Sequence, residues 1–187
     1  EHIELAIGDL ERAVAGHDGI GIIRVTCPEP IVQRMTPLIA RFQERHPKLR
    51  VEFVMSDRYL DLSKGDADVA FRSGDTDDEL VGRKIADSIW AIYASRDYVE
   101  RYGSPGRVEE LAQHRLVGFD ASMSRHRVAQ WLKGVAPDAN IVARNNSVLG
   151  SLYAVKSGIG IGALPTAIAD SEPDLLRLLG PISELTR

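Results

Sequence analysis

The sequence predicts an α/β fold with a largely parallel sheet, divided into two lobes. Short β-rich runs alternate with helical segments on both sides of a polar loop at 73–79. The 187 residues are 44% hydrophobic, which is enough to bury the core of one large domain or of two small lobes. No internal sequence repeat relates the two halves.

The first segment, 1–18, is predicted to be helical. Four apolar residues recur at spacings of four, three and four, with charged residues between them: Ile3, Ile7, Leu10 and Val14. This spacing fits the end of a longer coiled-coil helix, and equally an amphipathic helix that lies on its own domain. From the spacing alone, both interpretations stay open.

The first lobe is predicted to contain three strands and two helices. A β-rich run at 20–26 is followed by two prolines, which cannot continue a central strand. Apolar residues then recur at helical spacing from Ile31 until Pro47 ends the helix. The remaining elements are a strand at 49–55, a short helix at 59–64 with Gly65 as its stop, and a strand at 68–72.

The second half repeats this alternation. The predicted order is a strand at 89–94, a helix at 107–113, a strand at 115–119, a loop at 120–124, a helix through Trp131, a strand at 140–144, a helix after Asn145, and a glycine-rich strand at 159–164.

The glycine ladder near the end could suggest a nucleotide-binding loop. In a dinucleotide fingerprint, however, the glycines follow a strand and open a helix. Here the helix comes first, and Gly158 stands where a left-handed residue would close it. We therefore interpret Gly160 and Gly162 as positions in a buried strand where another backbone or helix packs closely.

Three helix N-termini follow predicted strands in the polar stretches after 26, after 119 and after 144. In an open α/β sheet such N-termini lie at the carboxyl ends of strands and carry a partial positive charge. If they converge on one crevice, they suit a carboxylate or another small anion.

Composition excludes several classes of protein. Lys and Arg number 23 against 27 Asp and Glu, a formal charge of −4, so the chain has no global basic footprint for nucleic acid. No apolar run is long enough to span a bilayer, and nothing marks this segment for export. A single cysteine, Cys27, rules out an intramolecular disulfide and fits a reducing, cytoplasmic compartment. No metal spacing and no catalytic serine elbow are present, so we predict no metal, no cofactor and no enzyme activity.

Several segments, in this order and spacing, resemble the effector-binding domain of LysR-type bacterial transcription regulators. The matching pieces are 23–25, 37–42 (PLIARF), 46–52 (HPKLRVE), 56–58 with 61–62, 65–74 (GDADVAFRSG), 117–120 with 131–132, and 154–165 (AVKSGIGIGALP). They cover nearly everything from Gly19 onward.

The resemblance implies a type II periplasmic-binding-protein-like fold, with two Rossmann-like lobes around a hinge and a small effector between them. We expect the end of a linker and dimerisation helix at 1–18, the first lobe at 19–86 and the second lobe at 87–187. In the family an N-terminal winged helix-turn-helix domain, not present in this sequence, reads DNA, and subunits form homodimers that assemble into homotetramers. The family's C-terminal return to the first lobe also appears absent, because 182–187 stand about where that strand begins.

The family's cleft, carried over by position, implies the site residues. The first wall comprises Cys27, Pro28, Glu29, Pro30, Ser56, Arg72 and Ser73. The opposite wall comprises Asp120, Ser122, Arg125, Asn145, Asn146 and Ser147. Relatives often carry a hydroxyl residue close to the position of Pro30. Because this chain has a proline there, we expect its contact with the effector to be made by backbone atoms or by apolar atoms.

Arg72 and Arg125 are the candidates for recognising a carboxylate of the effector, because a guanidinium group binds a carboxylate in a bidentate manner. The alternative for Arg72 is a structural pair with Asp57 or Asp68. Cys27 could be a redox sensor, but without a second thiol we favour a small buried cleft residue. Acidic residues at 66–68 and 75–78 lack the periodicity of a calcium loop and fit solvated turns.

The sequence therefore predicts the effector-sensing and oligomerisation portion of a LysR-type regulator. One rival is the solute-binding protein of a transporter, which shares the fold but should carry an export signal. A second rival is an enzyme on the same two-lobe scaffold, which the lack of an acid–base or nucleophile constellation disfavours.

Overall fold

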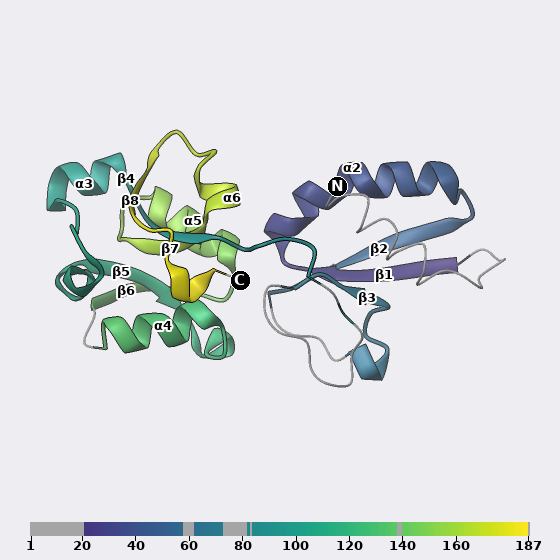
Figure 1. The fold of residues 1–187 in the computed structure, drawn as a ribbon, viewed down its shortest axis with the longest axis horizontal. Coiled ribbons are helices and arrows are strands. Elements are labelled where there is room, and N and C mark those ends of the chain that lie inside the picture. The colour runs from purple at the N-terminus through teal and green to yellow at the C-terminus, as the bar shows by residue number, and fades with distance from the viewer. Residues whose placement is uncertain (1–20, 58–61, 73–81, 83, 138–139, 187) are drawn as a thin grey trace. The chain divides into compact units, whose positions relative to one another are not determined.

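The structure is a computed structural model that describes residues 21–57, 62–72, 82, 84–137 and 140–186, with only the backbone described at Gln33, Arg34 and Ser63. The predicted linker helix at 1–18 lies outside the described residues. The chain divides into two compact units, 1–86 and 87–187. Each unit has its own sheet and core, and we describe each by itself (Figure 1).

The first unit is a three-stranded parallel sheet with a helix on one face. Its elements are β1 (Gly21–Cys27), α2 (Glu29–Arg45), β2 (Leu49–Met55), η1 (Leu62–Lys64) and β3 (Val69–Ala70). The strand order is β2-β1-β3, and β1 pairs with β2 in register from Gly21–Leu49 to Cys27–Met55. The predicted strand at 49–55 has the observed bounds, and the observed helix starts two residues before Ile31.

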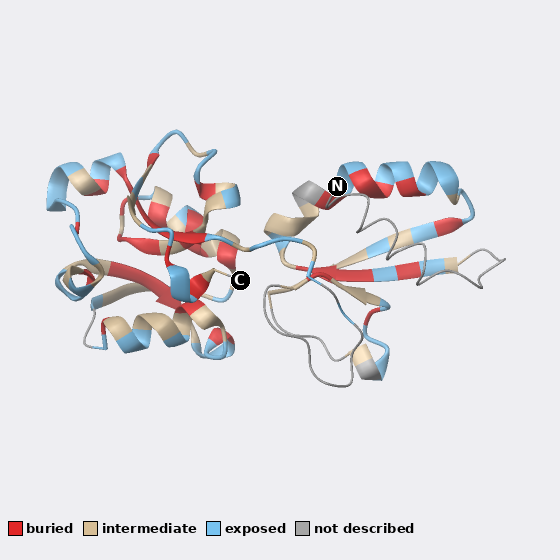
Figure 2. Ribbon diagram, in the orientation of Figure 1, coloured by how far each residue is buried: buried red, intermediate tan, exposed pale blue. Residues whose placement is uncertain are grey.

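The core of the first unit lies between α2 and the sheet. Alternate residues of β1 face the helix, and Met35, Leu38 and Phe42 of α2 pack against Val25 and its neighbours. Figure 2 shows buried and exposed residues alternating along α2, as the sequence periodicity predicted. The other face of the sheet carries Arg24 and Glu52, which form an exposed ion pair at 3.5 Å.

The second unit has a mixed sheet flanked by helices. Its strands are β4 (Trp90–Ser95), β5 (Arg115–Phe119), β6 (Asn140–Asn145), β7 (Gly162–Pro165) and β8 (Leu175–Leu179). Its helices are α3 (Arg96–Tyr102), η2 (Val108–Gln113), η3 (Ala121–Met123), α4 (Arg127–Val135), α5 (Val148–Lys156), α6 (Thr166–Ala169) and η4 (Ser183–Leu185).

The sheet of the second unit is not wholly parallel. Strand β4 lies between β7 and β8 and is antiparallel to both. Strand β5 is parallel to β6, and a bridge between Leu116 and Ile161 joins it to the start of β7. Strand β4 therefore runs opposite to the other four. The alternation of elements predicted four of these five strands, all but β8, and carried no signal for the reversal of β4.

The glycine ladder confirms the close-packing interpretation. Gly158 has φ +74°, the left-handed conformation expected at the end of α5. A Cβ at Gly160 would lie 2.7 Å from the Arg115 carbonyl oxygen, and one at Gly162 would lie 2.7 Å from Val155 Cγ2 of α5. A neighbouring backbone and a neighbouring helix thus require these two glycines.

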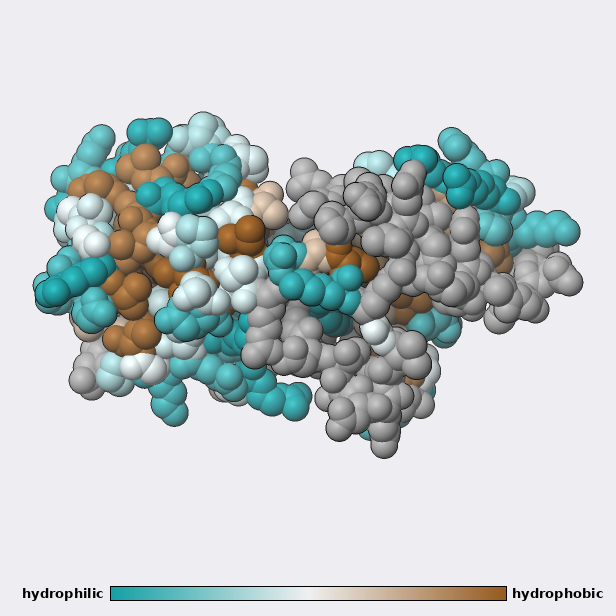
Figure 3. Space-filling view, in the orientation of Figure 1, coloured by the Kyte–Doolittle hydropathy of each residue, from teal (hydrophilic) through white to brown (hydrophobic). Residues whose placement is uncertain are grey.

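The second unit shows mixed hydropathy on the face drawn in Figure 3. On the face shown in Figure 3, hydrophobic residues lie between hydrophilic ones, and the hydrophilic residues dominate the outer margins.

The last described segment packs onto this unit, because Ile182 and Leu185 are buried in its core and the Ile182 amide donates to the Trp90 carbonyl at 2.8 Å.

Candidate functional site

The first predicted wall lies at the carboxyl ends of the three parallel strands. Because β1, β2 and β3 are adjacent and parallel, the residues that follow them reach one edge of the sheet. Cys27 ends β1, Ser56 follows β2, and Arg72 comes two residues after β3. The Ser56 amide donates to the Cys27 carbonyl at 3.1 Å, which ties the first two strand ends together.

Arg72 donates hydrogen bonds that connect the strand ends at this edge of the sheet. Its Nη2 donates to Thr26 Oγ1 at 2.5 Å, and its Nη1 donates to the Ser56 carbonyl oxygen. The Thr26 hydroxyl is fully buried and donates onward to the Val54 carbonyl at 2.9 Å. The arginine from the end of β3 therefore bonds to the ends of β1 and β2.

One of the two structural partners considered for Arg72 is engaged elsewhere. Asp68 Oδ2 accepts the amide of Arg24 at 2.7 Å. Arg72 nevertheless has an internal role, which its bonds to Thr26 and Ser56 supply.

The N-terminus of α2 offers few hydrogen-bond donors. The first four amide positions of a helix have no partner within the helix. Here Pro28 is the N-cap and Pro30 the second helical residue, so two of these positions have no N–H. The Ile31 amide donates to the Pro28 carbonyl at 2.9 Å, which leaves only the Glu29 amide without a partner among the described residues.

Glu29 itself is exposed in the first turn of α2. Its carboxylate makes no hydrogen bond or ion pair with the residues that the structure describes. The first wall therefore presents an acidic group to solvent.

Cys27 is fully buried at the end of β1. Burial raises the pKa of its thiol, and the nearby positive charge of Arg72 offsets part of that rise. Because the thiolate is the reactive form, a buried thiol with a raised pKa is chemically inert. This favours the interpretation of Cys27 as a packing residue over a redox sensor.

The second predicted wall lies at the carboxyl ends of β5 and β6. The Asp120 amide donates to the Asn145 carbonyl at 2.9 Å, which joins the two strand ends. Asp120 Oδ1 accepts the Ser122 amide at 2.8 Å and the Ser122 hydroxyl at 2.6 Å, so Asp120 caps η3. These two side chains thus shape the loop.

The residues around the start of α5 differ in their bonding. Ser147 is the N-cap, and its hydroxyl accepts the Gly150 amide at 2.9 Å. Asn145 is the last residue of β6, and its buried Nδ2 has no hydrogen-bond partner in the described chain. Asn146 and Arg125 are exposed, and neither side chain bonds to a described residue. Among the described residues of the predicted site, the arginine without a bonding partner is therefore Arg125, on this wall.

Two residues beside these walls were missed by the sequence reasoning. Thr26 was assigned only to a strand, although a hydroxyl residue within an apolar strand signals a buried polar contact.

His126 is the N-cap of α4, where its Nδ1 accepts a hydrogen bond from the Val128 amide at 3.3 Å. The centroid of its ring lies 4.8 Å from that of Phe119 and 5.4 Å from that of Trp90. Burial and then the charge of Arg127 lower its pKa to about 4. Histidine is not a preferred N-cap residue, so the sequence carried no signal for this role.

Of the predicted site residues, Ser73 lies outside the described residues. Within the described chain, no three His, Cys, Asp or Glu side chains gather in a way that could hold a metal ion. None of the described helices is long and apolar enough to cross a membrane.

Sequence comparison identifies the family. The profile of the LysR substrate binding domain matches residues 17–187. The HTH-type transcriptional regulator CrgA of Neisseria meningitidis serogroup C (strain 8013) is 30% identical over 188 residues, which cover 98% of this chain and 62% of that protein. An HTH-type transcriptional regulator of Xanthomonas campestris pv. campestris (strain 8004) is 31% identical over 128 residues, covering 67% of this chain and 36% of that protein. The chain thus spans less than two thirds of these relatives.

Solved structures agree. The regulatory domain of Neisseria meningitidis CrgA, a LysR-type regulator, has a TM-score of 0.68 at 32% identity, covering 85% of this chain and 81% of that one. Full-length AphB of Vibrio cholerae has a TM-score of 0.69 at 25% identity, covering 94% of this chain and 62% of that one. The predicted type II periplasmic-binding-protein-like fold is confirmed, and the relatives are transcription regulators, which favours a regulator over a transporter protein. The chain belongs to the LysR substrate-binding domain family.

Proposed function

We propose that this chain is the effector-sensing and oligomerisation portion of a LysR-type transcription regulator that works in the cytoplasm. The family match over 17–187 is the observation that carries this proposal. In the whole protein, DNA is bound by an N-terminal winged helix-turn-helix domain, and the subunits associate as homodimers or homotetramers. The chain acts as a sensor and not as an enzyme, in keeping with relatives that are transcription regulators.

The mechanism is a population shift. An effector that binds one conformation of the regulatory domain more tightly than another changes how the subunits pack, and thereby how the DNA-binding domains are spaced. A ligand with equal affinity for both conformations would change nothing.

The two walls are proposed to bind the effector. Their residues follow strand ends, the position where ligands bind in open α/β sheets. Internal hydrogen bonds hold several of these residues in place, for example those between Asp120 and Ser122 and between Ser56 and Cys27. The walls are therefore preorganised for binding.

Charge recognition is assigned to Arg125 in the second wall. Arg125 is exposed and bonds to no described residue, whereas Arg72 donates to Thr26 and to the Ser56 carbonyl. Arg125 thus has its guanidinium fork available for an anionic group of the effector. Asn145 Nδ2 of the same predicted wall has no partner among the described residues and is a further donor that a ligand-induced rearrangement would satisfy.

The test is a thermal-shift screen of the full-length regulator against small carboxylates, amino acids and aromatic acids, repeated with Arg125→Ala. A ligand that binds only the native state at about 100 times its Kd stabilises it by about 2.7 kcal/mol. We expect one chemical class to raise the Tm of the wild-type protein and to lose this effect in Arg125→Ala.

Arg41→Ala is the matched control, because Arg41 is an exposed arginine of α2 without a bond to the described residues. It should retain the whole ligand response. A folded wild-type protein that responds to no member of the panel, or a response lost equally in both variants, would count against the proposed function.

A further inference from the structure

The first wall differs in chemistry from an anion-binding helix N-terminus, and this bears on the class of effector. An N-terminus binds anions because its free amides point at the ligand. In α2, prolines at 28 and 30 remove two of the four donors and the Pro28 carbonyl takes the Ile31 amide, so one donor remains. A carboxylate at this wall would gain little of the usual hydrogen bonding.

The charges of the wall point the same way. The exposed Glu29 carboxylate has no partner among the described residues and would repel an anionic ligand group. Arg72 is the positively charged residue assigned to this wall, and it donates to the Ser56 carbonyl and to Thr26 Oγ1. The Cys27 side chain is fully buried and stays a neutral thiol.

We propose that Glu29 is the specificity-determining residue of the first wall, where it binds a positively charged, hydrogen-bond-donating group of the effector such as an ammonium. This inference rests on the proposed function and deepens it. A free carboxylate accepts the three N–H groups of an ammonium in charge-assisted hydrogen bonds.

The experiment compares probes that differ in one group on a common skeleton. Binding of phenethylamine, 2-phenylethanol and 3-phenylpropanoate to the full-length regulator is measured by calorimetry, alongside butylamine, butan-1-ol and pentanoate. We expect each amine to bind at least tenfold more tightly than its carboxylate counterpart, the ratio that one charge-assisted hydrogen bond supplies.

Two variants locate the effect. Glu29→Gln keeps the side-chain shape and removes the charge, and it should abolish the preference for amines. Glu44→Gln makes the same change in the last turn of the same 17-residue helix, about 22 Å away at 1.5 Å per residue, and should leave the preference intact. Pro30→Ser restores an amide and a hydroxyl to the first turn, and should raise carboxylate affinity.

The outcomes separate this inference from the proposed function. Carboxylates that bind most tightly, lose binding in Arg125→Ala and are unaffected or improved by Glu29→Gln would uphold the proposed function and overturn the role of Glu29. An amine preference that survives in Glu29→Gln would also overturn it. Failure of every probe to bind the folded wild-type protein would count against both.

Discussion

Thr26 Oγ1 lies 2.5 Å from Arg72 Nη2, from which it accepts a hydrogen bond, and its own hydroxyl donates a hydrogen bond to the Val54 carbonyl at 2.9 Å. The hydroxyl is fully buried, so its loss would leave a donor and an acceptor unsatisfied. We expect Thr26→Val, which is nearly isosteric, to lower the free energy of unfolding by about 1–3 kcal/mol. Urea unfolding of the chain measures this. Thr36→Val is the control, since Thr36 is exposed on α2 and its hydroxyl donates to the Val32 carbonyl of the same helix. This substitution should change the free energy of unfolding by about 0.5 kcal/mol or less.

The glycine ladder gives a second prediction. A methyl group at Gly160 would sit 2.7 Å from a backbone oxygen that cannot move without disturbing β5. Gly160→Ala should therefore destabilise the second unit by about 1–3 kcal/mol. Gly134→Ala in α4 meets nothing within 4 Å and should instead stabilise by about 0.5–1 kcal/mol through helix propensity. Equal effects of the two substitutions in thermal unfolding would refute the packing argument.

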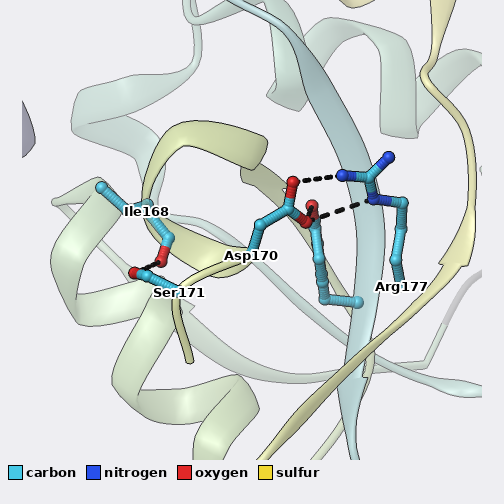
Figure 4. A network of polar contacts seen from close by, with 5 residues as sticks. Ile168, Asp170, Ser171 and Arg177 are labelled. Atoms are coloured by element: carbon cyan, nitrogen blue, oxygen red, sulfur yellow. Dashed lines mark hydrogen bonds and ion pairs between the residues drawn. The ribbon is translucent and has the colours of Figure 1, made fainter. Parts of the chain in front are cut away.

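Tyr93 provides a third prediction, based on a polar cluster across β4 and β8. Its hydroxyl donates to Asp170 Oδ1 at 2.7 Å, and Arg177, its neighbour across the strands, binds the same carboxylate through Nε at 3.2 Å and through Nη2 (Figure 4). The bond from Tyr93 and then those from Arg177 lower the pKa of Asp170. Tyr93→Phe should cost about 0.5–1.5 kcal/mol at neutral pH.

The sign of the pH effect of this cluster follows from that lowered pKa. The stabilisation is fully present above the ordinary Asp value of about 3.9 and is lost as pH falls through the lower folded value. Tyr93→Phe should therefore make the acid limb of the stability curve shallower than in the wild-type protein. Urea unfolding between pH 2 and pH 7 measures both curves, and parallel acid limbs would show that Tyr93 does not act through Asp170.

His126 gives a pH dependence of the same sign in a higher pH window. Its pKa is lowered from 6.5 to about 4 by burial, so between these values the unfolded chain binds a proton that the folded chain excludes. The free energy of unfolding should fall as pH drops through this window, by up to about 3 kcal/mol. His126→Asn keeps a good N-cap and should flatten this slope. Identical slopes for both proteins between pH 4 and pH 6.5 would exclude His126 as their source.

Much of the fold could be predicted because its signals are local. The apolar spacing along α2, the prolines at 28, 30 and 47, and the helix-before-glycine order near Gly158 all act within a few residues. The elements that were missed lack such signals. Helix α3 buries only Tyr98, so no apolar stripe marks it, and β8 reads Leu-Leu-Arg-Leu-Leu, which fits a buried helix as well as a strand.

The resemblance to the family placed the site residues at strand ends. The structure adds the hydrogen bonds that these residues form with partners far away in the sequence. The engagement of Arg72 depends on Thr26 and Ser56, which lie 46 and 16 residues away along the chain. The bond between Asp120 and Asn145 likewise joins the ends of β5 and β6, which are separated by α4 in the sequence. Such long-range pairings leave no local pattern, so from the sequence alone Arg72 and Arg125 were equivalent candidates.

The reversed strand of the second unit also constrains the order in which the chain can assemble. Tyr93 pairs with Gly162 of β7, which is synthesised 69 residues later, and Ile92 pairs with Leu179 of β8, which is synthesised 87 residues later. On the ribosome, β4 therefore emerges as six apolar and small residues, all buried in the finished fold, with neither neighbour yet synthesised. The first unit pairs its described strands within 21–70 and can form its sheet while that wait lasts. Strand β4 is thus an apolar segment that stays unpaired during synthesis, the kind of segment that a nascent-chain chaperone shields.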